Sequence, residues 1–319
     1  LLQVLSSFLV ILRLSYGFVG DFQSLRRSLI CFGASKQDSG PPLSVMVNGM
    51  PGPMAVEVAK ACLDRNLNLL NYGFTGPLVK ESTLVVEGAE RKVEVNLLKG
   101  LGSAASTLRL KEIKKANPNL IVVDFTQPAA ASGNVQAYVQ AECDFVMGTT
   151  GFNPDEISKI FELGSNYAII APNMAKQIVA LQAAIQQTAQ RFPGSFKGYS
   201  LSVTESHQSS KVDTSGTAKA IVNHLSTLNE QSFPVDKIVK VRERSSQIEF
   251  GVPEDALNGH AFHTYLFKSA DGSVTFELKH NVCGRRVYAE GTVDGVEFLH
   301  KIRGGKPKKR LYNMIDVLE

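Results

Sequence analysis

Beyond residue 43, short apolar runs alternate with segments of helical spacing. Residues 43–49 form an apolar run that ends in glycine, and residues 55–63 then carry apolar side chains at the spacing of one helix face. A second apolar run, 67–72, follows at the distance expected of a strand–helix–strand unit, whose crossover is right-handed. These residues therefore predict the first unit of a parallel α/β sheet.

The same alternation continues to about residue 174. Strands are predicted at 119–126, 144–151 and 167–171, with a helix near 134–141. Strands that alternate with helices are typical of a doubly wound, Rossmann-like parallel sheet. Ligands bind such sheets at the carboxyl ends of the strands, where this chain places Gly, Thr and Asn residues.

The pattern changes after Met174. A long helix is predicted to about Arg191, and the segments that follow alternate in polarity, as in a second domain of α+β type with a more open sheet. The tail over 290–318 is helix-like, and we expect it to return and pack on the first domain. The alternating segments are 200–204, 248–250, 260–267 and 274–280.

The first 42 residues differ from the rest. Residues 1–12 are apolar, serine and arginine are frequent afterwards, and only Asp21 and Asp38 are acidic. An acid-poor leader of this kind is typical of an organelle transit peptide, and the apolar run is too short and interrupted for a membrane span. The alternative is that the segment is not a translated part of the protein. In both cases the fold is expected to begin after the boundary at 40–42.

Composition limits the class of partner. The chain has 319 residues, 44% of them hydrophobic and 20% charged, which suffices for two domains. A formal net charge of +4, with scattered Lys and Arg, argues against nucleic acid but leaves anionic small molecules as partners. The four cysteines lie far apart without a C-x-x-C pair, so neither a metal site nor a disulfide framework is predicted.

The turn after the first strand resembles a dinucleotide fingerprint. Residues 49–55 match G-x-x-G-x-x-A between a strand and a helix, where backbone amides and the helix N-terminus would hold a pyrophosphate. Glycine-rich turns also occur for steric reasons alone, which is the alternative. Pro51 and Pro53 each remove one amide donor, although they also pre-set the backbone for a helical turn.

The second strand bears on the choice of cofactor. Residues 71–75 contain no Asp or Glu to accept the ribose hydroxyls of NAD, which favours NADPH. No arginine stands there either, and Lys80 is the nearest cation, so NADPH and NADH both remain open.

The stretch 205–217 carries the candidate chemistry. It follows a strand and leads into a helix, so the free amides of Ser215, Gly216 and Thr217 are expected to bind a carboxylate or a phosphate. His207 and Lys211 are the candidate proton donors. Taken singly, each feature also fits a solvated loop and an ordinary helix cap. A cation, an imidazole and an anion site within thirteen residues favour a site for a small dicarboxylate.

An arginine near the end of the alternating segments is a second candidate clamp. Arg285 precedes Arg286, and a guanidinium binds a carboxylate with two parallel hydrogen bonds. The alternative is an exposed arginine in a salt bridge, in which case the two residues would be interchangeable.

From about residue 44 to 319 the chain resembles the plant-type dihydrodipicolinate reductases, the 4-hydroxy-tetrahydrodipicolinate reductase family of lysine biosynthesis. The long motif at 205–217 is the most specific. The resemblance also rests on residues 123–126, 147–151, 171–174, 259–263, 280–285 and 312–318.

The resemblance implies hydride transfer from NADPH or NADH to an α,β-unsaturated cyclic imine dicarboxylate, followed by protonation of the resulting enamine carbon. His207 and Lys211 would hold the catalytic acid positions, and Gln208 stands where bacterial members carry a second histidine. The implied substrate-binding residues are Gln208, Ser215, Gly216, Thr217 and Arg285. The implied cofactor-binding residues are Gly49, Met50, Pro51, Gly52, Pro53, Met54, Phe125, Thr126, Gly148, Thr149, Thr150, Ala171, Pro172, Asn173 and Met174.

The resemblance also implies the domain organisation and the cellular location. A Rossmann domain over 43–174 would be completed by 290–319, and a mixed-sheet domain over 175–289 would bind substrate and form a homo-oligomer. With a transit segment over 1–42, the expected location is the chloroplast stroma.

The cofactor turn departs from the plant pattern. Plant relatives typically read Gly-Cys-Thr-Gly-Lys-Met-Gly, whereas residues 49–55 here read Gly-Met-Pro-Gly-Pro-Met-Ala. The basic residue is lost, and Ala55 replaces the third glycine, where a small residue still fits. The altered turn leaves a second hypothesis: a catalytically impaired, reductase-like protein with a nucleotide-sensing or assembly role.

Overall fold

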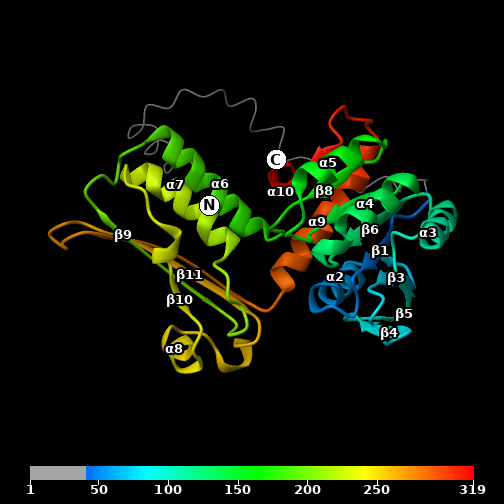
Figure 1. Cartoon of the computed structure of the whole chain (residues 1–319), viewed down its shortest axis with the longest axis horizontal. Helices are drawn as coiled ribbons and strands as arrows, with labels where there is room; N and C mark the ends of the chain where they lie inside the picture. The colour runs from blue at the N-terminus through cyan, green and yellow to red at the C-terminus, as the bar shows by residue number, and fades with distance from the viewer. Residues whose placement is uncertain (1–40) are drawn as a thin grey trace, which may run out of the picture. The chain divides into compact units, whose positions relative to one another are not determined.

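The computed structural model describes residues 41–319. Residues 1–40 of the predicted leader therefore lie outside the described residues. In the described part, a six-stranded sheet, a four-stranded sheet and a three-stranded sheet are joined by helices (Figure 1). The predicted combination of a doubly wound parallel sheet and a second, mixed sheet is confirmed.

The six-stranded sheet is parallel throughout, in the order β13-β8-β7-β6-β1-β2. Alternate residues of its strands pack on opposite faces: Val45 and Val47 join the core formed with α2 and α9, whereas Met46 joins the core formed with α3, α4 and α5. Helices on both faces define the doubly wound architecture. The strands are β1 (Ser44–Asn48), β2 (Asn68–Leu69), β6 (Leu120–Asp124), β7 (Asp144–Met147), β8 (Ala168–Ile170) and β13 (Leu311–Tyr312). The helices are α2 (Pro53–Asp64), α3 (Ala104–Ala116), α4 (Ala131–Gln140), α5 (Pro154–Glu162) and α9 (Arg286–Arg303).

The predicted second strand over 67–72 is wrong as a single element. Its first part forms β2 of the large sheet, and Tyr72 begins β3 (Tyr72–Thr75) of the small sheet. That sheet has the order β3-β5-β4, with β5 (Lys92–Lys99) and β4 (Thr83–Glu87). The sequence does not separate the two strands, because the buried Leu69 and Leu70 and the half-buried Tyr72 lie close together in the chain.

The mixed sheet has the order β10-β9-β11-β12, and α6 (Lys176–Arg191) and α7 (Gly216–Asn229) contribute to the core on one face. Strand β10 runs parallel to β9, and β11 is antiparallel to both β9 and β12. The strands are β9 (Ser200–His207), β10 (Val239–Val241), β11 (His260–Lys268) and β12 (Thr275–Cys283).

The predicted alternating segment at 248–250 is not a strand. It lies at the end of α8 (Arg244–Glu249), where Gln247 is buried and Ile248 is 40% exposed. The apolar residues Ile248 and Phe250 are spaced as in a strand, but local hydrogen bonds such as that from the Gln247 amide to the Glu243 carbonyl oxygen form a helical turn.

The C-terminal tail returns to the first sheet, as predicted, but it is not helical throughout. Helix α9 contacts α2, and residues 311–312 add β13 to the edge of the sheet beside β8. The chain then ends in α10 (Met314–Leu318), whose Asn313 caps it with hydrogen bonds to the amides of Ile315 and Asp316. Two residues are too few to show a periodic pattern, so the sequence did not predict β13.

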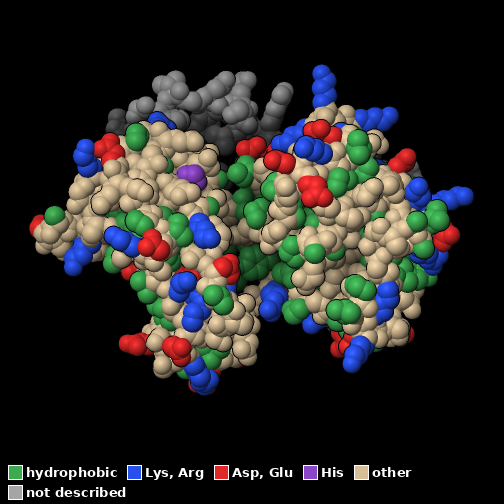
Figure 2. Space-filling model, viewed as in Figure 1, with side chains coloured by type: hydrophobic (Ala, Val, Ile, Leu, Met, Phe, Trp, Pro, Cys, Tyr) green, Lys and Arg blue, Asp and Glu red, His purple; other side chains and the backbone are tan. Residues whose placement is uncertain are grey.

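Basic and acidic side chains are interspersed over the face shown in Figure 2, without a large area of one sign. Within residues 41–319, no helix combines the length and the apolar character that a membrane span requires.

Candidate active site

The predicted cofactor loops lie together at one edge of the parallel sheet. Because β1, β6, β7 and β8 are parallel, the segments that follow them share the carboxyl edge. Gly49 has a φ of +103°, and a Cβ there would lie 2.1 Å from the carbonyl oxygen of Phe125. A Cβ on Gly148 would meet the Phe125 ring at 2.2 Å. Glycine is thus needed twice to let these three loops approach one another.

A buried carboxylate ties the same loops together. Asp124, at the end of β6, is fully buried, and its Oδ1 accepts hydrogen bonds from the hydroxyls of Thr126 and Thr149, each at 2.8 Å. Its Oδ2 accepts from the hydroxyl of Tyr138 at 2.5 Å and from Asn134 at 3.0 Å. The Thr149 side chain therefore shapes the loop from within, which leaves its backbone and the exposed Thr150 for a ligand.

The turn at 49–55 offers an anion fewer backbone donors than is usual, because the amides of Gly49 and Gly52 bind Phe74 and Gly49 and because prolines replace two others. Gly52 caps α2 without a side-chain hydrogen bond, and Pro53 has no N–H, so the first free amides of the helix are those of Met54 and Ala55. The Met50 side chain is fully buried in the core, so Met50 can offer a ligand only its backbone. These residues fit a dinucleotide bound at the helix N-terminus.

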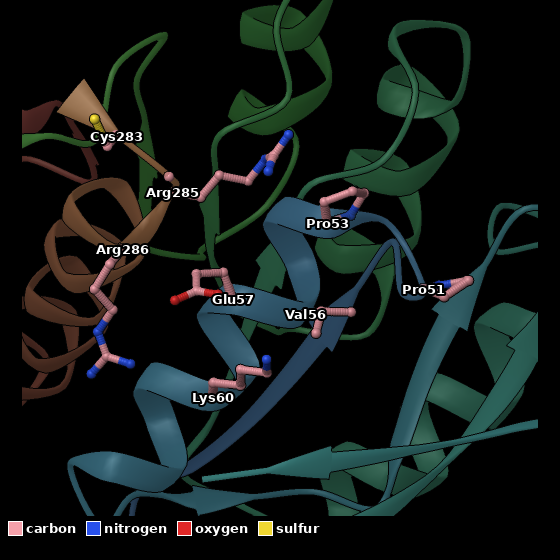
Figure 3. A pocket seen from close by; sticks show the side chains of 9 residues that line it. Pro51, Pro53, Val56, Glu57, Lys60, Cys283, Arg285 and Arg286 are labelled. Atoms are coloured by element: carbon pink, nitrogen blue, oxygen red, sulfur yellow. The ribbon is translucent and has the colours of Figure 1, made fainter. Parts of the chain in front are cut away.

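A cavity of about 450 Å³ adjoins this turn (Figure 3). Arg285 and Arg286 point in different directions from the start of α9. Arg286 is held in ion pairs with Asp64 and Glu290, whereas the side chain of Arg285 forms no hydrogen bond or ion pair with another residue of 41–319. The two arginines are therefore not interchangeable. The cavity is lined by Pro51, Pro53, Val56, Glu57, Lys60, Cys283, Gly284, Arg285 and Arg286.

The structure thus places Arg285 beside the cofactor turn as well as at the end of the mixed sheet. A Cβ on Gly259 would lie 3.3 Å from its Nη1, and Gly259 precedes β11. In the described part of the chain, neither a hydrogen bond nor an ion pair joins Arg285 to His207 or Lys211.

The stretch 205–217 spans the end of β9, a loop and the start of α7, as predicted. Ser215 caps the helix through its side chain, which accepts a hydrogen bond from the Ala218 amide. The next two amides, of Gly216 and Thr217, have no hydrogen-bond acceptor within residues 41–319 and can bind an anion. Asn173 donates a hydrogen bond to the Thr217 hydroxyl at 3.2 Å, which joins a predicted cofactor loop to this anion site.

His207 is buried among cations and a second histidine. Its Nε2 lies 3.3 Å from Nε2 of His263, at hydrogen-bonding distance. Burial, with the nearby charges of Arg242 and Lys211, lowers the pKa of His207 from 6.5 to about 4. The imidazole is therefore neutral in the unliganded protein near pH 7.

Lys211 supplies the positive charge of the loop. Its ammonium group donates to Asp213 at 2.8 Å, and its side chain is 24% exposed while that of Asp213 is 74% exposed. A partner this exposed holds a lysine weakly, because surface ion pairs contribute about 0–1 kcal/mol. Lys211 can therefore exchange Asp213 for an incoming carboxylate.

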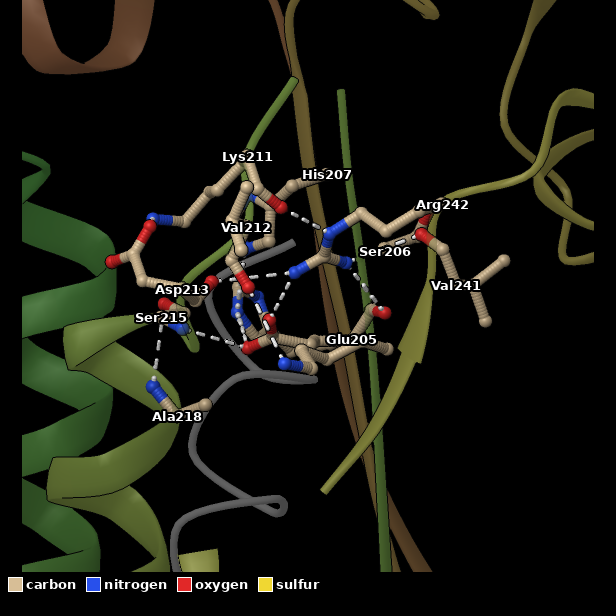
Figure 4. A network of polar contacts seen from close by, with 12 residues as sticks. Glu205, Ser206, His207, Lys211, Val212, Asp213, Ser215, Ala218, Val241 and Arg242 are labelled. Carbon is tan, nitrogen blue, oxygen red and sulfur yellow. Dashed lines mark hydrogen bonds and ion pairs between the residues drawn. The ribbon is translucent and has the colours of Figure 1, made fainter. Parts of the chain in front are cut away.

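Sequence reasoning missed the groups beneath this loop. Glu205 is fully buried and pairs with Arg242 at 2.5 Å, and its other oxygen accepts a hydrogen bond from the Ser215 amide (Figure 4). His263 lies opposite Glu205 in the pairing of β9 with β11. The strand alternation could have placed His263 on the face of Glu205, whereas no local pattern marks Arg242.

Glu205, His207 and His263 also offer ligand atoms within 4.8 Å of one another. Two imidazoles and a carboxylate can hold zinc or iron. Both oxygens of Glu205 are already engaged, by Arg242 and by the Ser215 amide, and a guanidinium lies against the group. The arrangement favours an ion-paired carboxylate, and the sequence-based expectation of no metal site stays a prediction.

Comparisons with known proteins agree with this architecture. The family model described as "Dihydrodipicolinate reductase, N-terminus" matches residues 43–174, and that described as "Dihydrodipicolinate reductase, C-terminus" matches residues 177–318. A solved structure, a dipicolinate-bound dihydrodipicolinate reductase from Paenisporosarcina sp. TG-14, shares the fold with a TM-score of 0.57 and 20% identity. That likeness covers 85% of this chain and 97% of the other.

Plant relatives are more similar in sequence. "4-hydroxy-tetrahydrodipicolinate reductase 2, chloroplastic" of Arabidopsis thaliana is 44% identical over 280 residues, 88% of this chain and 78% of the relative. "Probable 4-hydroxy-tetrahydrodipicolinate reductase 2, chloroplastic" of Oryza sativa subsp. japonica is 40% identical over 275 residues, 86% of this chain and 82% of the relative.

The chain combines a Rossmann-like sheet, whose loops lie at the carboxyl edge, with a mixed-sheet domain that carries the His207 loop. With the matches above, this architecture identifies an NAD(P)H-dependent oxidoreductase. More narrowly, the chain belongs to the dihydrodipicolinate reductase family. It groups with the chloroplastic reductases of lysine and diaminopimelate biosynthesis.

Proposed function

We propose that the chain reduces 4-hydroxy-tetrahydrodipicolinate, the compound in the names of its relatives, and that the stretch 205–217 does so together with the loops of the parallel sheet. When bound, a reduced nicotinamide supplies the hydride. The observation that carries the proposal is a contact between the two domains. Asn173 of a predicted cofactor loop donates a hydrogen bond to the hydroxyl of Thr217 in the predicted carboxylate site.

The carboxylate site is built from backbone and charge. One carboxylate of the substrate binds the free amides of Gly216 and Thr217 at the N-terminus of α7, where the helix dipole favours an anion. Lys211 exchanges Asp213 for the same carboxylate. Gln208, half-buried next to His207, donates its side-chain amide to the substrate, and the Ser215 cap sets the position of these groups.

His207 and Lys211 hold and deliver the proton. His207 is neutral in the unliganded site because its pKa is lowered by burial and by nearby cations. A bound dianion adds negative charge, which raises the pKa of an imidazole, so His207 takes up a proton as substrate binds. The 4-hydroxyl leaves as water with a proton of the neighbouring ring carbon, which gives an α,β-unsaturated imine, and the hydride then adds to carbon 4. The proton held by His207, or one from the Lys211 ammonium, goes to the resulting enamine carbon.

The remaining residues hold the dinucleotide. The turn 49–54 would hold the pyrophosphate, and residues 125–126, 148–150 and 171–174 would hold the nicotinamide portion of the bound dinucleotide. Arg285 lies between the turn and the end of the mixed sheet, and it clamps an anionic group there, for which the substrate's second carboxylate is the proposed ligand. NADPH is preferred to NADH because residues 71–80 contain no acidic side chain to accept the ribose hydroxyls.

We also propose a role for each domain. The nucleotide domain comprises 43–174 with the returning segment 290–319, which includes β13, and residues 175–289 bind substrate and form a homo-oligomer. We place the protein in the chloroplast stroma, as the names of its plant relatives suggest.

A coupled assay tests the proposal. A dihydrodipicolinate synthase generates the substrate in the cuvette, and NADPH oxidation is followed for the wild type, His207→Gln and Lys211→Ala. We expect kcat to fall by about 100-fold or more in each variant, because general acid catalysis contributes about that factor. Unchanged kcat in both variants would contradict the proposed catalytic roles of His207 and Lys211.

Matched controls lie on α7. His224→Gln and Lys219→Ala change the same residue types outside the loop, and both should retain wild-type turnover. Calorimetry adds a second outcome: a folded wild type that binds neither NADPH nor NADH supports the second hypothesis, a catalytically impaired protein with an assembly role, and contradicts the proposal.

A further inference from the structure

The loop between β9 and α7 is held from below by one guanidinium. Nε of Arg242 donates to the carbonyl oxygen of Lys211 at 2.8 Å, and its Nη2 donates to Glu205 at 2.5 Å and more weakly to the carbonyl oxygen of Asp213 at 3.5 Å. Its Nη1 donates to the backbone carbonyl oxygen of Glu205 at 3.3 Å. One side chain thus contacts Glu205 near the end of β9 and Lys211 in the middle of the loop (Figure 4).

Glu205 completes the connection at the other end of the loop. While Oε1 binds Arg242, Oε2 accepts the Ser215 amide at 3.0 Å, directly before the free amides of α7. Glu205 is fully buried and the Arg242 side chain is 16% exposed. Arg242 and Glu205 therefore join Lys211 to the cap of the carboxylate site through buried, charge-assisted hydrogen bonds.

We propose that Arg242 is a positioning residue for the reductase site: together with Glu205 it fixes the 208–215 loop so that Lys211 and the α7 amides face one substrate carboxylate together. This inference rests on the proposed function of the stretch 205–217. Arg242 reaches the site because β10 pairs with β9, with Val241 opposite Ser206, so the next residue lies beneath the loop.

A planar guanidinium is required for these contacts. Arg242 uses Nε and both Nη groups in different directions, whereas a lysine ammonium keeps the charge but cannot reach the separate acceptors in that geometry. If the residue only neutralised Glu205, lysine would replace it without loss. The two roles therefore predict different behaviour for Arg242→Lys.

The test measures substrate and cofactor binding separately. We expect Arg242→Lys to raise the KM for the dicarboxylate and the Kd of dipicolinate by about 10- to 100-fold, the loss of one to two charged hydrogen bonds. The Kd of NADPH and the far-UV circular dichroism should stay at the wild-type values. Arg244→Lys is the matched control, because Arg244 pairs with Glu254 in solvent, with 65% and 70% exposed side chains, and it should change nothing.

Chemical rescue separates positioning from stability. Arg242→Ala removes the guanidinium, and millimolar guanidinium chloride should restore part of its dipicolinate affinity, while equal sodium chloride should not. If Arg242→Ala does not fold, the double variant Glu205→Gln/Arg242→Lys, which leaves no unpaired buried carboxylate, is measured instead and should show the same rise in dicarboxylate KM.

The outcomes are distinct. A folded Arg242→Lys with wild-type KM for the dicarboxylate and wild-type dipicolinate Kd overturns the inference, and so does an equal loss of NADPH and dipicolinate binding. A wild type that neither turns over nor binds dipicolinate contradicts the proposed function instead.

Discussion

Gly291 of α9 lies so close to Met174 that a Cβ on it would be 1.8 Å from the Met174 carbonyl oxygen. The returning helix therefore packs its backbone against the last residue of a predicted cofactor loop. The contact joins the C-terminal segment to the segment that leads from the parallel sheet into α6.

Replacing Gly291 should destabilise the protein. Gly291→Ala forces α9 and the 171–174 loop apart, and overpacking of this kind costs about 1–3 kcal/mol in the free energy of unfolding. Urea denaturation gives the value. Gly304→Ala, at the end of the same helix with its nearest neighbour at 3.8 Å, serves as the control and should change little. Equal stability of the two variants would show that the close approach is not maintained in solution.

The hydroxyl of Tyr138 should matter more than an ordinary tyrosine hydroxyl. It donates to Asp124 and accepts from Asn48, and all three residues are buried. Tyr138→Phe leaves the Asn48 amide without its acceptor, and an unsatisfied buried group costs about 1–3 kcal/mol. Tyr167→Phe, which loses only a 3.5 Å bond to Pro307, is the comparison and should cost less. If urea unfolding showed a larger loss in the free energy of unfolding for Tyr167→Phe than for Tyr138→Phe, the hydrogen bonds of Tyr138 with Asp124 and Asn48 would be contradicted.

The buried histidines should make the protein sensitive to mild acid. Burial is the main cause that lowers the pKa of His263 to about 2, and the nearby His280 and His207 lower it further. Burial also lowers the pKa of His207 to about 4. Between these values and the ordinary 6.5, the unfolded chain binds more protons than the folded one, so the free energy of unfolding falls as pH decreases below about 6.5.

Urea unfolding from pH 7.5 to pH 5 measures this slope. His263→Gln removes one of the titrating groups, so its free energy of unfolding should depend less steeply on pH than that of the wild type. Stability that is constant over this interval would contradict the lowered pKa values.

Dicarboxylate binding should take up a proton. The pKa of His207 is lowered in the unliganded site, and the negative charge of dipicolinate raises it again, so at pH 6 the complex binds more protons than its separate components. Calorimetry in two buffers of different ionisation enthalpy gives the number of protons taken up. The value should be positive in the wild type and fall in His207→Gln; equal apparent enthalpies in both buffers for the wild type would argue against the assignment.

What the sequence predicted depended on whether a feature was contiguous in the chain. The 205–217 loop and the glycine turn carry their signals in a few consecutive residues, so the strand, the loop and the helix start could be placed correctly. Arg242 could not, because it reaches the loop only through the pairing of β10 with β9, and β10 has three residues with no buried side chain.

Short and amphipathic elements account for the remaining differences. The run 67–72 divides between two sheets, and β13 is too short for any periodicity, so long-range pairing decides both. At 248–250 the local helical hydrogen bonds outweighed a spacing typical of a strand. In each case the tertiary contacts supply information that a local pattern does not contain.

The most direct test of the central claim follows the hydride itself. The wild type is supplied with enzymatically generated 4-hydroxy-tetrahydrodipicolinate and with NADPH deuterated at the transferred position of C4, and the product is analysed by mass spectrometry. The account predicts tetrahydrodipicolinate that carries one deuterium, formed at a rate that falls by about 100-fold or more in His207→Gln. A folded protein that binds NADPH yet yields no labelled product would contradict it.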